Sequence, residues 1–407
     1  MRGGLQKTIP YYYGVFIVLA LLPQVLGFNG TIIDDVFKIA LIGILLYRTS
    51  SLCRIRRVGA FTSVFLFVSI VDTLGIVIIN DISILREGMN IIISILLVFV
   101  LVEPSLKTIY NEKNDILIFY KIYVCFILMA SIYNMIVHYN SLFHITSLSV
   151  YNTNNICSFF DNKNTFGVYL IFGVLATTIL KVITKQNKWS FISIIFLLNE
   201  LMAMCRTAII LSVIMIVISF FVDNRNRIKN TTIFMCILFI ALYLIFKNQT
   251  INRFIFETLF SSTTSLDARS GYIDSLLPFA KGTHFWFGYG NDGALELAKN
   301  YTGNSYYHNG YLKVMMSGGI IKLALELIAI LFSVHYGKKC RRFDKCIGNL
   351  CLLSSFVYVI YIFAESVVLF DKPVVAIMAV MFIISMPVMF YNFLSNKGSI
   401  VEEHNAI

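Results

Sequence analysis

The feature that most constrains this chain is the recurrence of apolar segments that are long enough to cross a membrane. Of its 407 residues, 58% are hydrophobic and 14% are charged, and its mean hydropathy is +0.78. A helix of roughly 20 apolar residues spans the hydrocarbon core of a bilayer, which is about 30 Å thick. The sequence therefore predicts an all-α polytopic membrane protein in which residues 1–407 form a single integral membrane domain.

About twelve spanning helices are predicted from the positions of these apolar segments. They are expected near residues 10–27, 33–47, 58–79, 88–102, 116–137, 164–182, 189–205, 207–222, 231–246, 308–336, 347–364 and 373–394. A single helix over 189–222 would be roughly 50 Å long, against a core of about 30 Å. We therefore expect two short helices joined by a tight turn there, with Arg206 at the turn.

Lysine and arginine fall mainly on the connections that follow the second, fourth, sixth, eighth and tenth predicted helices. Cytoplasmic connections of membrane proteins carry an excess of these residues. Both termini are therefore expected in the cytoplasm, and residues 247–307 are expected to form a long extracytoplasmic loop. The formal net charge of +11 is interpreted as an orientation signal, so no nucleic-acid partner is predicted.

The predicted loop 247–307 is the one long stretch of the chain that does not resemble a membrane helix. It is polar and aromatic, with several glycines, and loops of this length are usually functional. It leads into His308, where polar sequence gives way to an apolar helix. A neutral histidine at such a place is suited to act as a general base. The alternative is a histidine that only forms a hydrogen bond with the start of the helix.

Other polar residues expected outside the membrane leave two interpretations open. Arg206 is interpreted as functional, or as an interfacial arginine that reaches toward lipid head groups. Arg269 is interpreted as functional, or as a surface arginine paired with an aspartate. The stretch around Lys163 and Asn164 either contacts a polar ligand or is a solvated loop in which Asn164 or Thr165 caps the next helix.

The sequence contains no motif for nucleotide or metal binding. Its eight cysteines are scattered without a CxxC pair, and no P-loop, GxGxxG or HExxH is present. No metal and no cofactor are therefore predicted. A disulfide between Cys157 and Cys205 remains a minor alternative, because these are the two cysteines expected near the outer face.

Five short motifs in this order resemble the O-antigen ligase and polymerase-like superfamily. The resemblance covers about residues 155–335. The motifs are Phe160-Asp161-Asn162-Lys163-Asn164-Thr165-Phe166-Gly167, Cys205-Arg206-Thr207-Ala208, Ala268-Arg269-Ser270, Phe287-Gly288-Tyr289-Gly290, and His308-Asn309-Gly310-Tyr311-Leu312 followed by Ser317-Gly318-Gly319. Cys205 stands where members of the family often have serine, and this difference is expected to have little consequence.

The resemblance implies a GT-C-like fold and an enzyme of the bacterial inner (plasma) membrane whose active site faces outside. Such an enzyme transfers a glycan from an undecaprenyl-diphosphate-linked oligosaccharide donor to an acceptor hydroxyl, with inversion and without metal. His308 is then the base, and Arg206 and Arg269 bind the diphosphate. Asn309 and Tyr311 orient His308 or the diphosphate, and Lys163 and Asn164 contact substrate.

Three functions remain open at this point. The first is a polymerase that joins lipid-linked repeat units of an O-antigen, capsule or exopolysaccharide, and this is preferred. The second is a ligase that delivers the glycan to lipid A core or to protein. The third is a flippase for lipid-linked oligosaccharides, for which ionisable residues such as Lys322 and Glu326 within predicted spans give some support, although these two could pair with each other. Expected partners include membrane lipids, chain-length regulators and a flippase protein.

The aromatic residues of the long loop are expected to offer flat faces to sugar rings. An aromatic belt at the membrane interface is the alternative interpretation. These residues are Phe285, Trp286, Phe287, Tyr289, Tyr301, Tyr306 and Tyr307.

Overall fold

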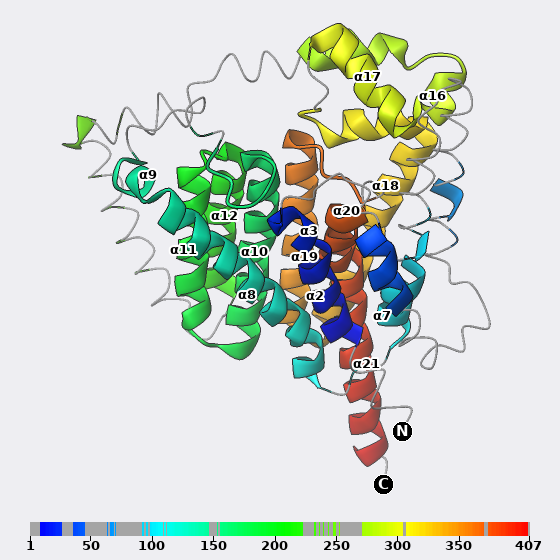
Figure 1. Ribbon diagram of the computed structural model, residues 1–407. Helices are drawn as coiled ribbons and strands as arrows, with labels where there is room; N and C mark the ends of the chain where they lie inside the picture. The colour runs from blue at the N-terminus through cyan, green and yellow to red at the C-terminus, as the bar shows by residue number, and fades with distance from the viewer. Residues whose placement is uncertain are drawn as a thin grey trace. The chain divides into compact units, whose positions relative to one another are not determined.

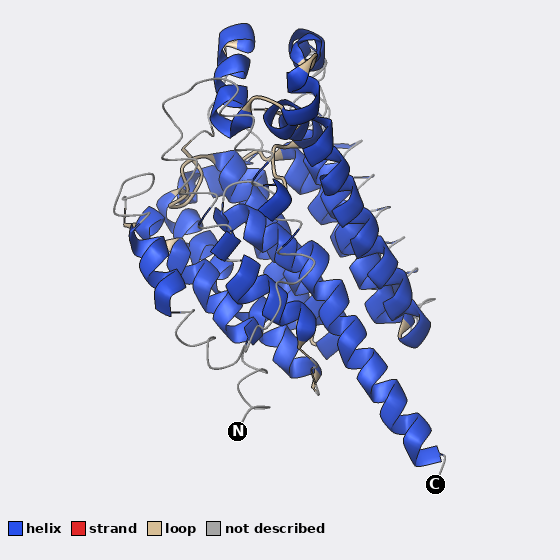
Figure 2. Ribbon diagram, turned by 90° about the vertical axis from the view of Figure 1, so that its right-hand side faces the viewer, coloured by secondary structure: helices blue, strands red, loops and turns tan. Residues whose placement is uncertain are grey.

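The described part of the computed structural model is built from helices (Figures 1 and 2). It describes residues 9–26, 36–44, 98–108, 112–145, 155–222, 271–303, 307–369 and 373–405, together with short stretches and single positions between them. All regular elements in this part of the chain are helical, and it contains no β-strand. The predicted all-α fold class is therefore confirmed.

Five helical segments in the described part are long and apolar enough to cross a membrane. They are α8 (Lys113–Val137), α10 (Lys163–Thr184), α18 (Gly310–Phe343), α19 (Lys345–Ala364) and the segment Ile377–Lys397. The chain is thus a multi-pass membrane protein. The spans predicted at 33–47, 58–79, 88–102 and 231–246 lie wholly or partly outside the described residues, so the number twelve stays a prediction.

The chain divides into two compact units, each described here by itself. One unit, formed mainly by residues 117–265, contains most of α8, α9 (Tyr139–Phe143), α10, α11 (Lys188–Met202) and α12 (Arg206–Val222). Helix α10 packs against both α11 and α12. A Cβ atom at Gly173 of α10 would lie 2.9 Å from the ring of Phe196 of α11. The glycine therefore allows these two helices to approach closely.

The turn between α11 and α12 contains only residues 203–205. Two short helices over 189–222 are thus confirmed. Before them, α10 begins at Lys163 and is capped by Asn162, whose side chain accepts a hydrogen bond from the Thr165 N–H at 2.8 Å. The prediction that Asn164 or Thr165 is the cap was wrong by two or three positions. Both residues already lie in the first helical turn, whereas Asn162 has the extended backbone that a cap requires.

The other unit is organised around the hairpin of α18 and α19. A Cβ at Gly348 of α19 would lie 2.3 Å from the Arg341 Cα of α18, so a residue larger than glycine would force the two helices apart. Against this hairpin pack η6 (Met381–Ser385) and α21 (Met386–Asn405), and α20 (Pro373–Val380) contacts η6. The Tyr13 hydroxyl of α2 (Ile9–Ala20) donates to the Ile377 carbonyl at 2.9 Å, which attaches α2 to this group.

The remaining helices of the described part are short. They are α3 (Leu22–Val25), η1 (Val98–Val102), α7 (Glu103–Lys107), η5 (Leu277–Phe279), α16 (Thr283–Phe287) and α17 (Gly290–Thr302). The last three lie in the predicted long loop, so short helices occur in the described part of that loop. Its position on the outer side of the membrane stays a prediction.

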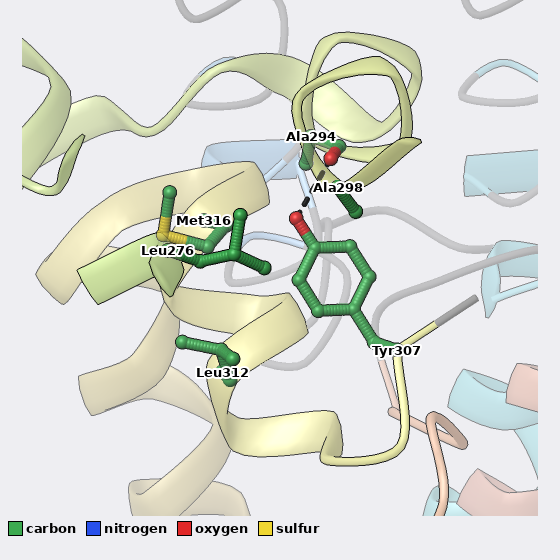
Figure 3. Close-up of a cluster of buried hydrophobic side chains, with 6 residues drawn as sticks. All are labelled: Leu276, Ala294, Ala298, Tyr307, Leu312 and Met316. Atoms are coloured by element: carbon green, nitrogen blue, oxygen red, sulfur yellow. Dashed lines mark hydrogen bonds between the residues drawn. The ribbon is translucent and has the colours of Figure 1, made fainter. Parts of the chain in front are cut away.

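A small hydrophobic core joins these loop helices to the first turns of α18. It consists of Leu276, Ala294, Ala298, Tyr307, Leu312 and Met316, all of them buried (Figure 3). Alanines on α17 leave room for the Tyr307 ring, and the Tyr307 hydroxyl donates to the Ala294 carbonyl at 2.7 Å. The described part of the loop is therefore packed against α18 and is not a solvated, irregular segment. We call residues 271–303 the loop cap, as distinct from the residues that cap helices.

Candidate functional site

His308 lies two residues before the first residue of α18, as the sequence predicts. The next residue, Asn309, is the helix cap, and its side-chain oxygen accepts a hydrogen bond from the Leu312 N–H at 3.0 Å. A Cβ at Gly310 would lie 2.9 Å from the Glu365 carbonyl oxygen at the end of α19. The backbone at His308 is therefore held by a capped helix start that rests directly on another helix.

The side chain of His308 is half-buried and faces Tyr272, an aromatic residue of the loop cap. The ring of Tyr272 stands edge-on to the imidazole, with centroids 5.9 Å apart and planes at 86°. The preceding residue, Tyr307, is 1% exposed, and its hydroxyl donates a hydrogen bond to α17. In the sequence, His308 thus lies between a buried tyrosine and the asparagine that caps α18. These two fixed neighbours restrict the positions that the imidazole can take.

Two of the aromatic residues expected to face sugars have structural roles instead. Tyr307 has no face available, because its ring fills the core beneath α17, so that prediction was wrong for this residue. The ring of Tyr289 stacks on His284 at 3.9 Å, nearly parallel, and burial raises the pKa of its hydroxyl, which donates to the Phe279 carbonyl. Exposed faces remain on Phe285, Trp286 and Tyr301. Tyr306 lies outside the described residues.

The motifs Phe287-Gly288-Tyr289-Gly290 and Ser317-Gly318-Gly319 meet in one backbone contact. Helix α18 is broken at Gly319, where φ is 66° and ψ is −167°. A Cβ there would lie 2.2 Å from the Trp286 carbonyl oxygen, and a Cβ at Gly288 would lie 2.4 Å from the backbone of Ser317. The Tyr289 N–H donates to the Met316 carbonyl at 2.8 Å. These glycines therefore let α16 rest directly on the break in α18, which attaches the loop cap to α18.

In the unit that contains α10 and α12, two predicted substrate-binding cations begin neighbouring helices. Lys163 is the first residue of α10 and Arg206 is the first residue of α12. The Cys205 thiol donates to the Lys163 carbonyl at 3.0 Å, so the two helix starts lie side by side. Both side chains are half-buried at this junction. Each helix start adds roughly half a positive charge, which makes this place suited to an anion with more than one charge.

The loop before α10 is held in place by Asn134 of α8. Its side-chain oxygen accepts from the Ser158 N–H at 2.9 Å, and its amide donates to the side chain of Asn199 at 3.0 Å. Ser158 also donates to the Ala130 carbonyl through its hydroxyl. Sequence reasoning missed Asn134, because a lone asparagine in an apolar helix gives no local sign of the loop that it binds. The loop that Asn134 holds leads to Lys163, whose ammonium donates to the Thr153 hydroxyl at 3.3 Å.

Cys205 has a structural role that the sequence did not reveal. Its thiol directly links the starts of α10 and α12. A Cβ at Gly167 would lie 3.0 Å from this sulfur, so the glycine makes room for the link. A serine hydroxyl could donate in the same way, which explains why either residue suits this position. Neither Cys157 nor Cys205 forms a disulfide, so that alternative was wrong.

The predicted site residues therefore fall into two groups. Lys163, Asn164 and Arg206 belong to one compact unit, and His308, Asn309 and Tyr311 belong to the other. The Tyr311 hydroxyl donates to the Val359 carbonyl at 3.4 Å. Arg269 lies outside the described residues.

Buried acids and a buried lysine lie within the helices that carry these groups. Glu200 of α11 accepts from the Ser212 hydroxyl at 2.8 Å. Glu326 of α18 accepts from the Tyr358 hydroxyl at 2.6 Å and from the Leu369 N–H at 3.1 Å. The Lys322 ammonium donates to the Ser317 hydroxyl at 3.4 Å, beside the break in α18. Glu326 thus ties α18 both to α19 and to the segment that follows α19.

A comparison with protein families matches residues 191–326 to the family described as O-antigen ligase. This range begins before Arg206 and ends after Gly319, so it contains four of the five motifs and omits the one that holds Lys163 and Asn164. The comparison with curated proteins found no match at the significance required. Residues 191–326, about a third of the chain, are thus similar to an O-antigen ligase domain, in agreement with the superfamily that the motifs resemble.

Proposed function

We propose that this protein is a polysaccharide polymerase that joins undecaprenyl-diphosphate-linked oligosaccharide units by inverting glycosyl transfer. The observation that carries the proposal is the pair of adjoining helix starts at Lys163 and Arg206. Two cations and two helix N-termini in one place match a diphosphate better than a group with a single charge. The family domain over residues 191–326 supports glycosyl transfer as the reaction class.

In the proposed reaction, an acceptor hydroxyl attacks the anomeric carbon of the donor sugar. The new bond forms between that oxygen and the anomeric carbon, while the bond from this carbon to the diphosphate oxygen breaks with its electron pair. The hydroxyl proton passes to a ring nitrogen of His308. Lipid diphosphate leaves with the additional negative charge, and the configuration at the anomeric carbon is inverted. Proton transfer by a positioned base typically contributes about 10²–10⁴-fold to the rate.

Each remaining residue has a role in this proposal. Arg206 and Arg269 offer planar pairs of N–H donors to diphosphate oxygens, which stabilise the leaving group. Lys163 contributes a further positive charge, and Asn164 contacts the donor. Asn309 fixes the helix start that carries His308, and Tyr311 supports it against α19. The reaction is proposed to occur at the outer leaflet of the plasma membrane, with both termini in the cytoplasm.

The central test replaces His308 by alanine in the full-length protein. We expect His308→Ala to abolish polymer formation from purified lipid-linked units while the protein still inserts at normal abundance. The matched control is His144→Ala, which removes an exposed histidine of another predicted outer loop and should leave polymer formation unchanged. A normal ladder of long polysaccharide from His308→Ala would show that His308 is not the base.

A ligase is the second candidate, and the description of the matching family favours it. The two activities differ in the acceptor that they need. A polymerase should make a ladder of products from lipid-linked units alone, whereas a ligase should release lipid diphosphate only when a lipid A core or protein acceptor is added. Products that appear solely with such an acceptor would replace the polymerase proposal by the ligase. Chain-length regulators and a flippase are proposed as partners in either case.

A further inference from the structure

Basic side chains gather where α18 meets α19. Three exposed residues lie on the last turns of α18, namely Lys338, Arg341 and Arg342, and Lys345 is the first residue of α19. Together with the half-buried Lys339 they form what we call the hairpin basic cluster, which consists of Lys338, Lys339, Arg341, Arg342 and Lys345. The acidic residue among them, Asp344, caps α19 by accepting from two backbone N–H groups. Its other oxygen lies 4.0 Å from the Lys113 ammonium, so the cluster keeps a strongly positive charge.

The length of α18 is sufficient to bring this cluster to the level of lipid head groups. From the break at Gly319 to its end at Phe343, the helix is about 36 Å long at 1.5 Å per residue. The hydrocarbon core is about 30 Å thick, so a helix of this length can cross it and extend beyond it. Aromatic rings, which favour this level, gather here as well: Tyr391 lies 5.4 Å from Tyr336 and 6.1 Å from Phe343, measured between centroids.

Two residues of the cluster have contacts that limit their movement. The Lys339 ammonium lies 5.1 Å from the ring centre of Tyr336 and 5.3 Å from that of Tyr391. The backbone of Arg341 is pressed against Gly348, where no side chain could fit. A site that is ordered in advance loses less conformational entropy on binding. The Lys339 ammonium and the Arg341 backbone are therefore ordered parts of the cluster.

We propose that the hairpin basic cluster binds the phosphate of an anionic phospholipid at the membrane surface. Basic clusters next to a spanning helix attract anionic head groups by about 1 kcal/mol per cation. The aromatic rings and the depth of the cluster favour a lipid over an acidic protein segment, because both place the cations beside head groups. This site is separate from the residues assigned to glycosyl transfer, and the proposal does not depend on that function.

The test measures binding of phosphatidylglycerol to the full-length protein in nanodiscs of phosphatidylcholine, read by native mass spectrometry. Wild type should retain phosphatidylglycerol in preference to phosphatidylcholine, and added salt should weaken this preference. Arg341→Gln with Arg342→Gln should lower the affinity roughly thirtyfold. Lys338→Gln with Lys345→Gln, which removes the same charge from other positions of the cluster, should have a similar effect.

The matched control is Lys185→Gln with Lys188→Gln, which removes two exposed cations at the connection between α10 and α11. It should leave the affinity for phosphatidylglycerol unchanged. Equal retention of the two lipids by wild type would overturn the proposal. An equal loss in the control, or unchanged affinity in both cluster variants, would overturn it as well. An acidic protein that binds the cluster while phosphatidylglycerol does not would identify the other class of partner.

Discussion

The local structure around Arg206 depends on residues that are far from it in the sequence. It begins α12 beside the start of α10, and the thiol of Cys205 holds the two starts together. Asn134, 72 positions before Arg206 in the chain, fixes the loop that leads into α10. Arg206 itself is half-buried at this junction.

If Arg206 and Arg269 both bind diphosphate, each should be sensitive to shape as well as to charge. Lysine keeps the charge but loses the two-pronged donor geometry, and hydrogen bonds to charged groups are worth about 1.5–3 kcal/mol. We expect Arg206→Lys and Arg269→Lys each to lower turnover roughly ten- to a hundredfold. Arg253→Lys, a change in the same predicted loop, should have almost no effect. Both Arg269 and Arg253 lie outside the described residues, so these expectations rest on the sequence.

The double lysine variant tests whether the two arginines act on one group. Residues that act as a unit are not additive, so the combined loss of turnover should be smaller than the product of the single losses. Initial rates of polymer formation at saturating lipid-linked units provide the measurement. Independent, multiplicative losses, or near-normal rates in both single variants, would show that the two residues do not bind a shared diphosphate.

Among the elements, α18 combines the most tasks. Its start carries His308, its break receives α16, and its middle holds Glu326. The break divides one long apolar segment into a short helix that contacts the loop cap and a longer helix that can span the membrane. A glycine at the break is required on two grounds: its φ of 66° is unfavourable for other residues, and the Trp286 carbonyl occupies the place of a Cβ.

Substitution of Gly319 at the break should destabilise the protein by more than backbone strain alone. Gly319→Ala adds a steric clash to the strained backbone, so we expect the free energy of unfolding to fall by at least about 2 kcal/mol. The control is Gly303→Ala, where φ is 72° but open space surrounds the Cβ position; it should lose only about 1 kcal/mol. Thermal unfolding of the two purified variants in the same detergent makes the comparison. Equal midpoints would mean that α16 does not rest on the break as described.

Glu326 should act through the hydrogen bonds that it accepts. Glutamine keeps a side-chain oxygen for both the Tyr358 hydroxyl and the Leu369 N–H, so Glu326→Gln should retain activity within a few-fold. Glu326→Leu leaves both donors buried without an acceptor, at a cost of about 1–3 kcal/mol for each. It should disturb the end of α19, against which Gly310 and the start of α18 rest.

The measurement for Glu326 is the rate of polymer formation together with the thermal midpoint of each variant. Tyr358→Phe, which removes one of the two donors, should fall between Glu326→Gln and Glu326→Leu in both quantities. If glutamine proved as damaging as leucine, the charge of Glu326 and not its acceptor role would be what the protein requires.

For the whole molecule, the family match crosses the boundary between the two compact units. Residues 191–265 of the matched range belong to the unit with α10 and α12, and residues 266–326 belong to the unit with α18. The matched range thus takes the cation that begins α12 from one unit and His308 from the other.

Independence from divalent metal is a prediction for the whole reaction. If arginine and lysine stabilise the departing diphosphate, the purified enzyme should polymerise lipid-linked units at the same rate in excess EDTA. The control is a parallel reaction with a magnesium-dependent glycosyltransferase, which EDTA should stop. Loss of activity that magnesium or manganese restores would show that the cationic side chains are not sufficient.

The sequence by itself determined the features that depend on neighbouring residues. Apolar length set the helical membrane class, the same length argument divided 189–222 into α11 and α12, and the change from polar to apolar residues located the helix start after His308. Only the tertiary structure decided the contacts between distant residues. It paired Gly288 with Ser317, joined Cys205 to Lys163, and buried Tyr307 under α17. Local patterns report which face of a helix is apolar, but not which distant segment will pack against it.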